Sequence, residues 1–495
     1  MTIALHVLAT ATVQVDLHAI APEVVLAGAL LAVLVIDLFL PDRFKEINGA
    51  IAMAGVVGAA IALVTLIGEH RTTFNGMFVL DSYALLFKFL FLAVAGVLLL
   101  MTVDYLNEEV RGAQGEFYFL LLASLLGMMV MPSARDMIAL FIALETVSIP
   151  AFVLAGFKKR DASSNEAAIK FFLIGVLASA VMLFGMSLIY GVARSTNLAV
   201  IAEALQGRTH DPLVSASILL IITGFAFKVS AAPFHFWAPD TYEGSPVPVA
   251  AFLSVASKAA GFAGLLQVAF LAFPHHTHVW APGFAILAAA TMTVGNVIAL
   301  SQTNIVRLLA YSSIAQAGYM LLPLGVVAGK GPEVQGDAFA SALTYILIYS
   351  FMNLGAFAVV IAVGRRKPGN LISDYEGLLQ REPGLALAGA FFLLSLAGVV
   401  PTAGFWAKFF VFRAAISGGT IWLAALMVVN TLVGLYYYVQ VAAKMILREA
   451  PDRERLGVPR ALTVAIALMV LVIVVVTVYP DAFNHFSPRS TLIAL

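Results

Sequence analysis

The sequence is a succession of long apolar runs, each separated from the next by a short polar stretch. A helix needs about 20 apolar residues to cross the hydrocarbon core of a bilayer. Fourteen runs reach or approach this length, so we predict an all-α polytopic membrane protein with about 14 transmembrane helices. The predicted spans are 22–40, 48–68, 82–104, 116–133, 136–157, 166–191, 212–236, 247–272, 280–301, 304–326, 338–363, 385–415, 419–446 and 460–480.

The composition supports lipid as the solvent of this chain. Hydrophobic residues make up 61% of it and charged residues only 11%, whereas a soluble domain carries about 25% charged residues. The net charge is zero, which argues against a nucleic-acid partner. The chain has no cysteine, which excludes disulfides and cysteine-ligated iron–sulfur clusters within it. The sequence also contains no phosphate-binding loop or Rossmann fingerprint in a strand–helix context, so we expect no cofactor in this chain.

The distribution of Lys and Arg predicts the orientation. Loops that follow odd-numbered spans carry 14 of these residues and loops that follow even-numbered spans carry 6. Because positive loops favour the cytoplasmic side, both termini are predicted on the outer side. The N-terminus has no basic segment before its first apolar stretch, so the first helix is expected to act as the insertion signal.

Two of the predicted helices look broken. In the seventh, Lys228 is followed by Pro233, and in the twelfth, Pro401 is followed by Lys408. The two breaks lie five helices apart and therefore enter the membrane from opposite sides. This pattern is typical of an inverted repeat, here helices 4–8 against helices 9–13. Two ordinary proline kinks are the alternative.

These features divide the chain into four regions. The first region is 1–115, with helices 1–3. The two inverted five-helix repeats are 116–272 and 280–446. The last region, 460–495, holds helix 14 and a C-terminal tail.

Four ionisable residues fall at bilayer depth, namely Glu145, Lys228, Lys258 and Lys408. A charge near the bilayer centre costs about 2.5–3.5 kcal/mol on insertion scales. Burial disfavours the charged form of a lysine, and a nearby carboxylate favours it. Opening and closing a Glu–Lys pair would therefore make a lysine take up and release a proton. The four residues predict a proton relay.

Three other interpretations stay open. Long lysines can snorkel to the membrane surface, and we assign Lys88, Lys170 and Lys444 to this class because they lie near helix ends. Lys258 has more than ten mostly apolar residues on each side and cannot snorkel easily. Glu145 could form a purely structural pair with a lysine. A passive membrane scaffold would tolerate substitution of all four charges.

Histidines occur at two notable places. His235 follows Pro233 and could pass protons between lysines, since imidazole titrates near neutral pH, or it could simply be hydrogen-bonded. His275, His276 and His278 form a cluster without carboxylates, which we do not expect to bind a metal.

Three motifs resemble a known family. They are FHFWAPDTYEGSPVPVAAFLSVASK (Phe234–Lys258), SSNEAAIKFFLIG (Ser163–Gly175) and NIVRLLAYSSIAQAGYM (Asn304–Met320). The chain resembles the subunit N family of the proton-pumping NADH–quinone oxidoreductase, respiratory complex I, whose members are antiporter-like membrane subunits. The first string is far more specific than a short pattern, and the resemblance extends over essentially the whole chain.

The resemblance implies fourteen helices and two inverted repeats around broken helices 7 and 12. It also implies that the family's relay residues match Glu145, Lys228, Lys258, Lys408 and His235 of this sequence. The chain would be a subunit of a translocase in a prokaryotic cell membrane, with no redox centre of its own. NADH, flavin, iron–sulfur clusters and quinone would belong to partner subunits, and antiporter-like subunits would be its neighbours. A subunit of a multi-subunit sodium/proton antiporter or of a membrane-bound hydrogenase is the alternative.

Overall fold

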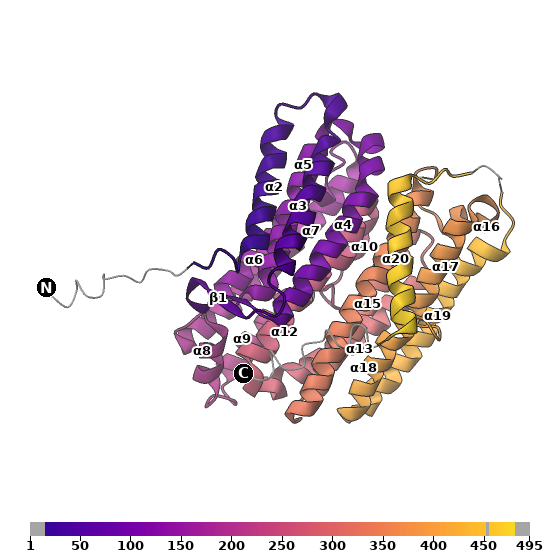
Figure 1. Ribbon diagram of the computed structural model, residues 1–495. Helices are drawn as coiled ribbons and strands as arrows, with labels where there is room; N and C mark the ends of the chain where they lie inside the picture. The colour runs from indigo at the N-terminus through magenta and orange to yellow at the C-terminus, as the bar shows by residue number, and fades with distance from the viewer. Residues whose placement is uncertain (1–14, 368, 452–454, 481–495) are drawn as a thin grey trace.

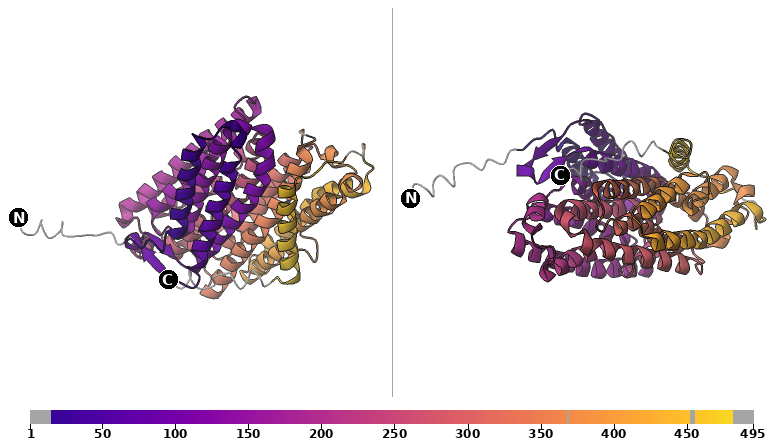
Figure 2. Two further views of the ribbon diagram at one scale, coloured as in Figure 1. Left: turned by 45° about the horizontal axis from the view of Figure 1, so that its top comes forward. Right: turned by 90° about the horizontal axis from the view of Figure 1, so that it is seen from below.

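The computed structural model describes residues 15–367, 369–451 and 455–480. Long helices lie side by side, with the N-terminal half of the chain beside the C-terminal half (Figures 1 and 2). Eleven of the described helices are long and apolar enough to cross a membrane. This confirms the prediction of a multi-spanning helical membrane protein. The predicted tail 481–495 lies outside the described residues.

Each predicted span coincides with helical structure. The helices of the first half are α2 (Ala21–Asp37), α3 (Ile47–Val64), α4 (Ser82–Glu109), α5 (Gln114–Val130), α6 (Met137–Ala155), α7 (Ala162–Ala193), α9 (Pro212–Lys228) and α10 (Trp237–Gly244). Those of the second half are α13 (Thr277–Ala299), α14 (Ile305–Leu321), α15 (Pro332–Gly364), α17 (Pro383–Ala397), α18 (Ala403–Ser417), α19 (Ile421–Leu447) and α20 (Arg460–Val478).

Polar residues immediately before the apolar runs start several of these helices. The side chain of Asp81 accepts a hydrogen bond from the first turn of α4, and that of Asp136 accepts two from the first turn of α6. Asn304 caps α14 in the same way. Such caps satisfy amide groups that have no partner inside the helix. They fix where the apolar segments begin.

The predicted span 247–272 is one continuous helix of unusual geometry, which we call the α11–α12 helix. It begins as α11 (Val247–Phe252), and two π-helical segments, Leu253–Ser257 and Val268–Ala272, flank α12 (Lys258–Gln267). Single π-helical turns inside α-helices occur frequently at functional sites. Lys258 directly follows the first of them.

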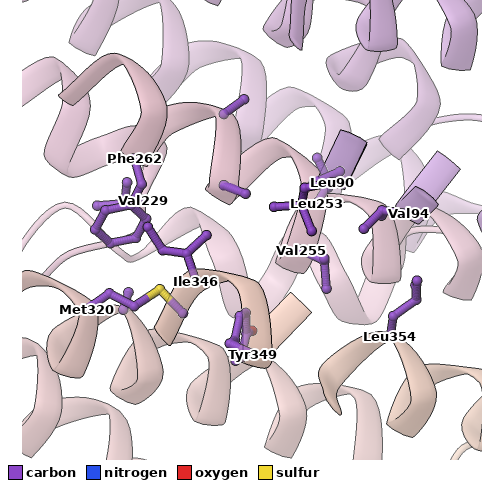
Figure 3. Packing of buried hydrophobic residues seen from close by; sticks show 14 of the residues in the cluster. Leu90, Val94, Val229, Leu253, Val255, Phe262, Met320, Ile346, Tyr349 and Leu354 are labelled. Carbon is purple, nitrogen blue, oxygen red and sulfur yellow. The ribbon is translucent and has the colours of Figure 1, made fainter. Parts of the chain in front are cut away.

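The α11–α12 helix, α14 and α15 form the centre of the molecule. Their most apolar segments are almost completely buried, whereas those of α3, α7 and α20 are largely open to the surroundings. Figure 3 shows Val229, Phe262, Met320 and Ile346 close together in this core, each from a different element. The lysine-bearing helix therefore lies in the protein interior and not against lipid.

Besides α10, which lies between the predicted spans 212–236 and 247–272, three elements were not predicted from the sequence. A two-stranded antiparallel hairpin joins β1 (Arg71–Thr73) to β2 (Phe78–Leu80), and short helices form at α8 (Leu198–Leu205) and α16 (Leu378–Arg381). The hairpin and α8 lie at the same end of the bundle (Figure 1), which we call the hairpin end. There Arg71 binds Asp16 at 2.8 Å, and this hydrogen bond lowers the pKa of the Asp16 carboxyl.

Close packing of α13 against α14 gives a first test of the fold. A Cβ atom on Gly295 would lie 2.5 Å from the backbone nitrogen of Ala315. Gly295→Ala is therefore expected to lower the stability by about 1–3 kcal/mol, as overpacking usually does. Thermal denaturation of the purified protein in detergent measures this. Gly28→Ala is the matched control, because nothing lies within 4 Å of its added Cβ. Equal midpoints for the two variants would contradict the packing described here.

Candidate proton-relay site

The structure places the three predicted lysines inside the protein. Lys228 is 3% exposed, Lys258 1% and Lys408 7%. Among the described residues, no carboxylate lies within ion-pair distance of any of the three amines. Glu145 is only half-buried, on α6. The four residues thus share the membrane-spanning part of the molecule but have different surroundings.

Lys228 and Glu145 bind two different serines and form no direct hydrogen bond or ion pair with each other. Lys228 is the last residue of α9, and its amine donates to the hydroxyl of Ser148 at 2.9 Å. Ser148 lies one turn after Glu145 on α6, where the two share a face. The Glu145 carboxylate accepts from Ser179 at 2.5 Å. The structure does not form the direct Glu145–Lys228 pair of the switch hypothesis.

Lys258 binds α14. Its amine donates to the backbone carbonyl of Ser313 at 2.8 Å and to the hydroxyl of the same residue at 2.5 Å. Lys258 is the first residue after the π-helical segment Leu253–Ser257. Both acceptors are uncharged, so this amine is held at the centre of the core without a counter-ion.

Lys408 lies against the end of a broken helix. Its amine donates to the carbonyl of Ala397 at 2.7 Å, where α17 ends, and helix C-termini favour a positive charge. The amine also lies 5.1 Å from the centre of the Tyr319 ring. Gly398 has φ +83°, and a Cβ there would lie 2.8 Å from Lys408 Cδ. A glycine is therefore required both by the backbone conformation and by the lysine.

Both predicted helix breaks are present. The first separates α9 from α10 around Pro233, and the second separates α17 from α18 around Pro401. Each of the two prolines follows a cis peptide bond. At the first break the amide of Ala232 donates to Thr291 at 2.9 Å and the Trp237 indole donates to the Phe227 carbonyl at 3.1 Å. These side-chain contacts satisfy backbone groups that the break releases, as bilayer depth requires.

His235 is buried at the first break, 6% exposed. Within the described part of the chain, its Nδ1 atom has no hydrogen-bond partner, and its ring packs against Phe236 with the ring centres 4.7 Å apart. The described contacts of His235 include neither Lys228 nor Lys258. Its relay role stays a prediction.

The histidine cluster near residue 276 binds backbone groups. The ring of His276 donates to the carbonyl of Arg208 at 3.3 Å, and that of His278 donates to the carbonyl of Thr209 at 2.7 Å. Among residues 15–367, 369–451 and 455–480, no group of three His, Cys, Asp or Glu side chains is arranged to hold a metal ion.

Two buried ion pairs were not predicted from the sequence, and the first contains Lys88. Lys88 is 0% exposed; its amine lies 2.7 Å from Glu23 of α2 and 4.6 Å from the centre of the Phe78 ring. The expectation that Lys88 snorkels is wrong, because α2 and the hairpin cover it. The side chains of Lys170 and Lys444 are partly exposed, at 42% and 29%, as expected near helix ends. The sequence did contain a sign of the Lys88–Glu23 pair, because Glu23 is an acid at the start of an apolar span.

A second missed pair joins Asp81 to Arg135 at 2.5 Å. Arg135 also donates to the carbonyl of Pro132 at 2.9 Å and to the side chain of Gln267 in α12. The pair lines a cavity of about 630 Å³ together with His70, Glu203 and others. It ties α4 and the α11–α12 helix together at the hairpin end.

The profile of a family described as NADH:quinone oxidoreductase/Mrp antiporter, transmembrane, matches residues 134–434. A relative from Trichlorobacter lovleyi named NADH-quinone oxidoreductase subunit N is 42% identical over 441 residues, which cover 88% of this chain and 89% of the relative.

Solved structures share the fold. A chain of respiratory complex I from Thermus thermophilus superposes with a TM-score of 0.78 at 32% identity, and the match covers 94% of this chain and 98% of that one. A chain of the Mrp complex from Dietzia superposes with a TM-score of 0.80 at 19% identity, with 97% of each chain covered. The second likeness concerns the fold alone. The chain therefore belongs to the NADH:quinone oxidoreductase/Mrp antiporter transmembrane family.

Proposed function

We propose that the chain is the N-type, proton-translocating membrane subunit of an NADH–quinone oxidoreductase. It couples electron transfer to quinone in other subunits to proton movement across the membrane. The observation that carries the proposal is the set of three lysine amines buried within the helices, each hydrogen-bonded to neutral oxygens. The similarity to a subunit N along most of both chains supports it.

The full architecture is part of the proposal. The chain has 14 membrane helices, with three in 1–115, inverted repeats of five in 116–272 and 280–446, and one in 460–495. The two similar breaks around Pro233 and Pro401, each between two apolar helices, support the repeats. Both termini lie on the outer side of a bacterial cell membrane, as the Lys/Arg distribution favours.

Protons move in the order Glu145, Lys228, Lys258, Lys408, and His235 assists between the first two lysines. Moving one charge against 100 mV costs about 2.3 kcal/mol. A shift of a counter-charge by a few ångströms at low dielectric supplies energy of that size. NADH, flavin, iron–sulfur clusters and quinone belong to partner subunits, and other antiporter-like subunits flank this chain.

Affinity purification tests the assignment. The full chain, tagged in its own cells and solubilised gently, is expected to co-purify with flavin- and iron–sulfur-containing subunits and with NADH:quinone reductase activity. An unrelated tagged membrane protein from the same cells is the control. Recovery with small membrane subunits alone, together with sodium/proton exchange in vesicles, would instead assign the chain to an antiporter and reject this proposal.

A further inference from the structure

An open groove lies between α17 and α20, and α20 stands at the outer edge of the bundle in the view from below (Figure 2, right). The volume of the groove is about 810 Å³, and apart from Glu382 and Thr463 its lining residues are apolar. One face of α20 packs against α15 and α4, which leaves a neighbouring face to line the groove. We call this feature the α17–α20 groove. Its principal lining residues are Leu385, Ala388, Phe391, Ala467, Val470 and Val474.

The length of the groove matches one leaflet of a bilayer. On α20 its lining residues run from Thr463 to Val474, and eleven residues of helix rise about 16 Å. The hydrocarbon core of a bilayer is about 30 Å thick, so one leaflet is about half of that. The groove therefore begins near the membrane surface, at the start of α20, and ends near the bilayer midplane.

The groove is too narrow and too short for another membrane helix. A volume of about 810 Å³ over about 16 Å of helix gives a mean cross-section of about 50 Å². A helix with its side chains is about 10–12 Å across, which is a cross-section of about 80–110 Å², and it needs about 30 Å of length to span the core. Extended hydrocarbon chains from one leaflet fit both dimensions.

Two arginines lie at the surface end of the groove. Arg460 is the first residue of α20 and precedes Thr463 by one turn, so it lies on the helix face that lines the groove. Arg455 lies five residues before Arg460, and both side chains are exposed. The Glu382 carboxylate lines the same end and accepts a hydrogen bond from the amide of Gly457 at 3.2 Å. These described residues thus place two positive charges and one negative charge at this end.

Exposed arginines at the end of an apolar groove match the two parts of an anionic phospholipid. Guanidinium groups bind phosphate through paired N–H donors, and basic pockets between membrane helices bind anionic headgroups. Apolar walls alone do not select one lipid over another, because lipid tails are as apolar as the side chains that they contact. A preference for an anionic headgroup must therefore come from the arginines.

We propose that the α17–α20 groove binds one anionic phospholipid, with its acyl chains along the groove and its phosphate at Arg455 and Arg460. The lipid fills the space that the side chains of α17 and α20 leave open. The proposal adds a binding site to the chain and does not depend on the proton-translocating function proposed above.

The headgroup part of the proposal is tested by native mass spectrometry of the full chain, purified in detergent and supplied with phosphatidylglycerol or phosphatidylcholine. The wild type is expected to retain one phosphatidylglycerol more than phosphatidylcholine. Each arginine contributes about a fivefold increase in affinity for an anionic surface, the equivalent of about 1 kcal/mol. The double variant Arg455→Gln, Arg460→Gln is therefore expected to bind this phosphatidylglycerol about 25-fold more weakly. Arg160→Gln is the matched control, because Arg160 is exposed between α6 and α7.

The acyl-chain part is tested by filling the groove. Ala467 is exposed on the lining face of α20, and the indole of Ala467→Trp would occupy the space of the acyl chains. One bound lipid is expected to be lost, whichever headgroup is supplied. Ala180→Trp is the matched control, because it makes the same change on the exposed face of α7. If Ala467→Trp does not fold, the arginine variant decides, since its substitutions are at the surface.

The occupant is identified in the complete complex. The chain has no cysteine, so a photoreactive label on Ala467→Cys reports on the groove alone, and it is expected to react with phospholipid. Reaction with a partner subunit would assign the groove to protein and overturn the proposal. Equal retention of the two lipids by the wild type, or unchanged lipid retention in a folded Ala467→Trp variant, would overturn it as well.

Discussion

Lys258→Met is expected to abolish proton translocation while the chain still folds and assembles. Methionine has nearly the length of lysine and suits a buried apolar site, but it cannot bind or release a proton. The lost partners are the Ser313 carbonyl and hydroxyl. That hydroxyl can turn to a carbonyl of its own helix, so the structural cost is small. Dye-monitored acidification of vesicles that contain the whole complex measures the effect.

Lys444→Met is the control for this substitution. Lys444 lies in the last turn of α19, is partly exposed and pairs with Glu376 at 3.2 Å. The substitution Lys444→Met makes the same chemical change outside the proposed relay. An exposed ion pair contributes about 1 kcal/mol or less to stability. Translocation is expected to stay at the wild-type level. Equal loss in both variants would point to a general effect of losing a lysine, and normal translocation with Lys258→Met would remove this residue from the relay.

Lys88→Met is expected to have the largest effect on stability. The substitution leaves the Glu23 carboxylate without its cation in a site that is 9% exposed. Removing one partner of a buried ion pair typically costs about 3–5 kcal/mol. The double variant Lys88→Met, Glu23→Leu removes both charges and is expected to recover most of this loss. Denaturation of the purified protein in detergent compares the wild type, the two single variants and the double variant.

The same series separates a structural role from proton transport. If the pair only ties α2 to α4, the stable double variant translocates protons like the wild type. A double variant that is stable but inactive would add Lys88 to the relay. Stability losses that simply add, with no recovery in the double variant, would mean that the two side chains do not act as a pair.

The sequence predicted those features that are costly in a bilayer. Lys258 and Lys408 were found because a charge in a long apolar run is rare, and Pro233 and Pro401 because proline interrupts helical hydrogen bonding. The predicted span 385–415 is accordingly divided into α17 and α18. Helix boundaries were less predictable, and α10 lies entirely beyond the predicted end of span 212–236.

Features that depend on tertiary packing were missed. Lys88 looked accessible because it is near the start of α4, and only the arrival of α2 and of Phe78 covers it. The π-helical segments around α12 have no local sequence signal that we recognise. Gln316 and Tyr438, which are hydrogen-bonded to each other in the core, are 122 positions apart, and their meeting depends on how α14 and α19 pack. Uncharged polar residues are also common in membrane helices, so the sequence alone does not single out Gln316 or Tyr438.

The partners of the buried lysines determine which of them can work in a cycle. When Lys258 gives up its proton, only neutral groups remain around the amine. The site then holds no unpaired charge, and the amine can be protonated again. When Lys88 gives up its proton, a bare carboxylate is left inside the protein. A buried lysine beside a serine can therefore release and rebind a proton repeatedly, whereas a buried lysine beside a glutamate stays charged and holds two helices together. A buried lysine that can cycle between its protonated and neutral forms is therefore recognised by the neutral oxygens that surround its amine.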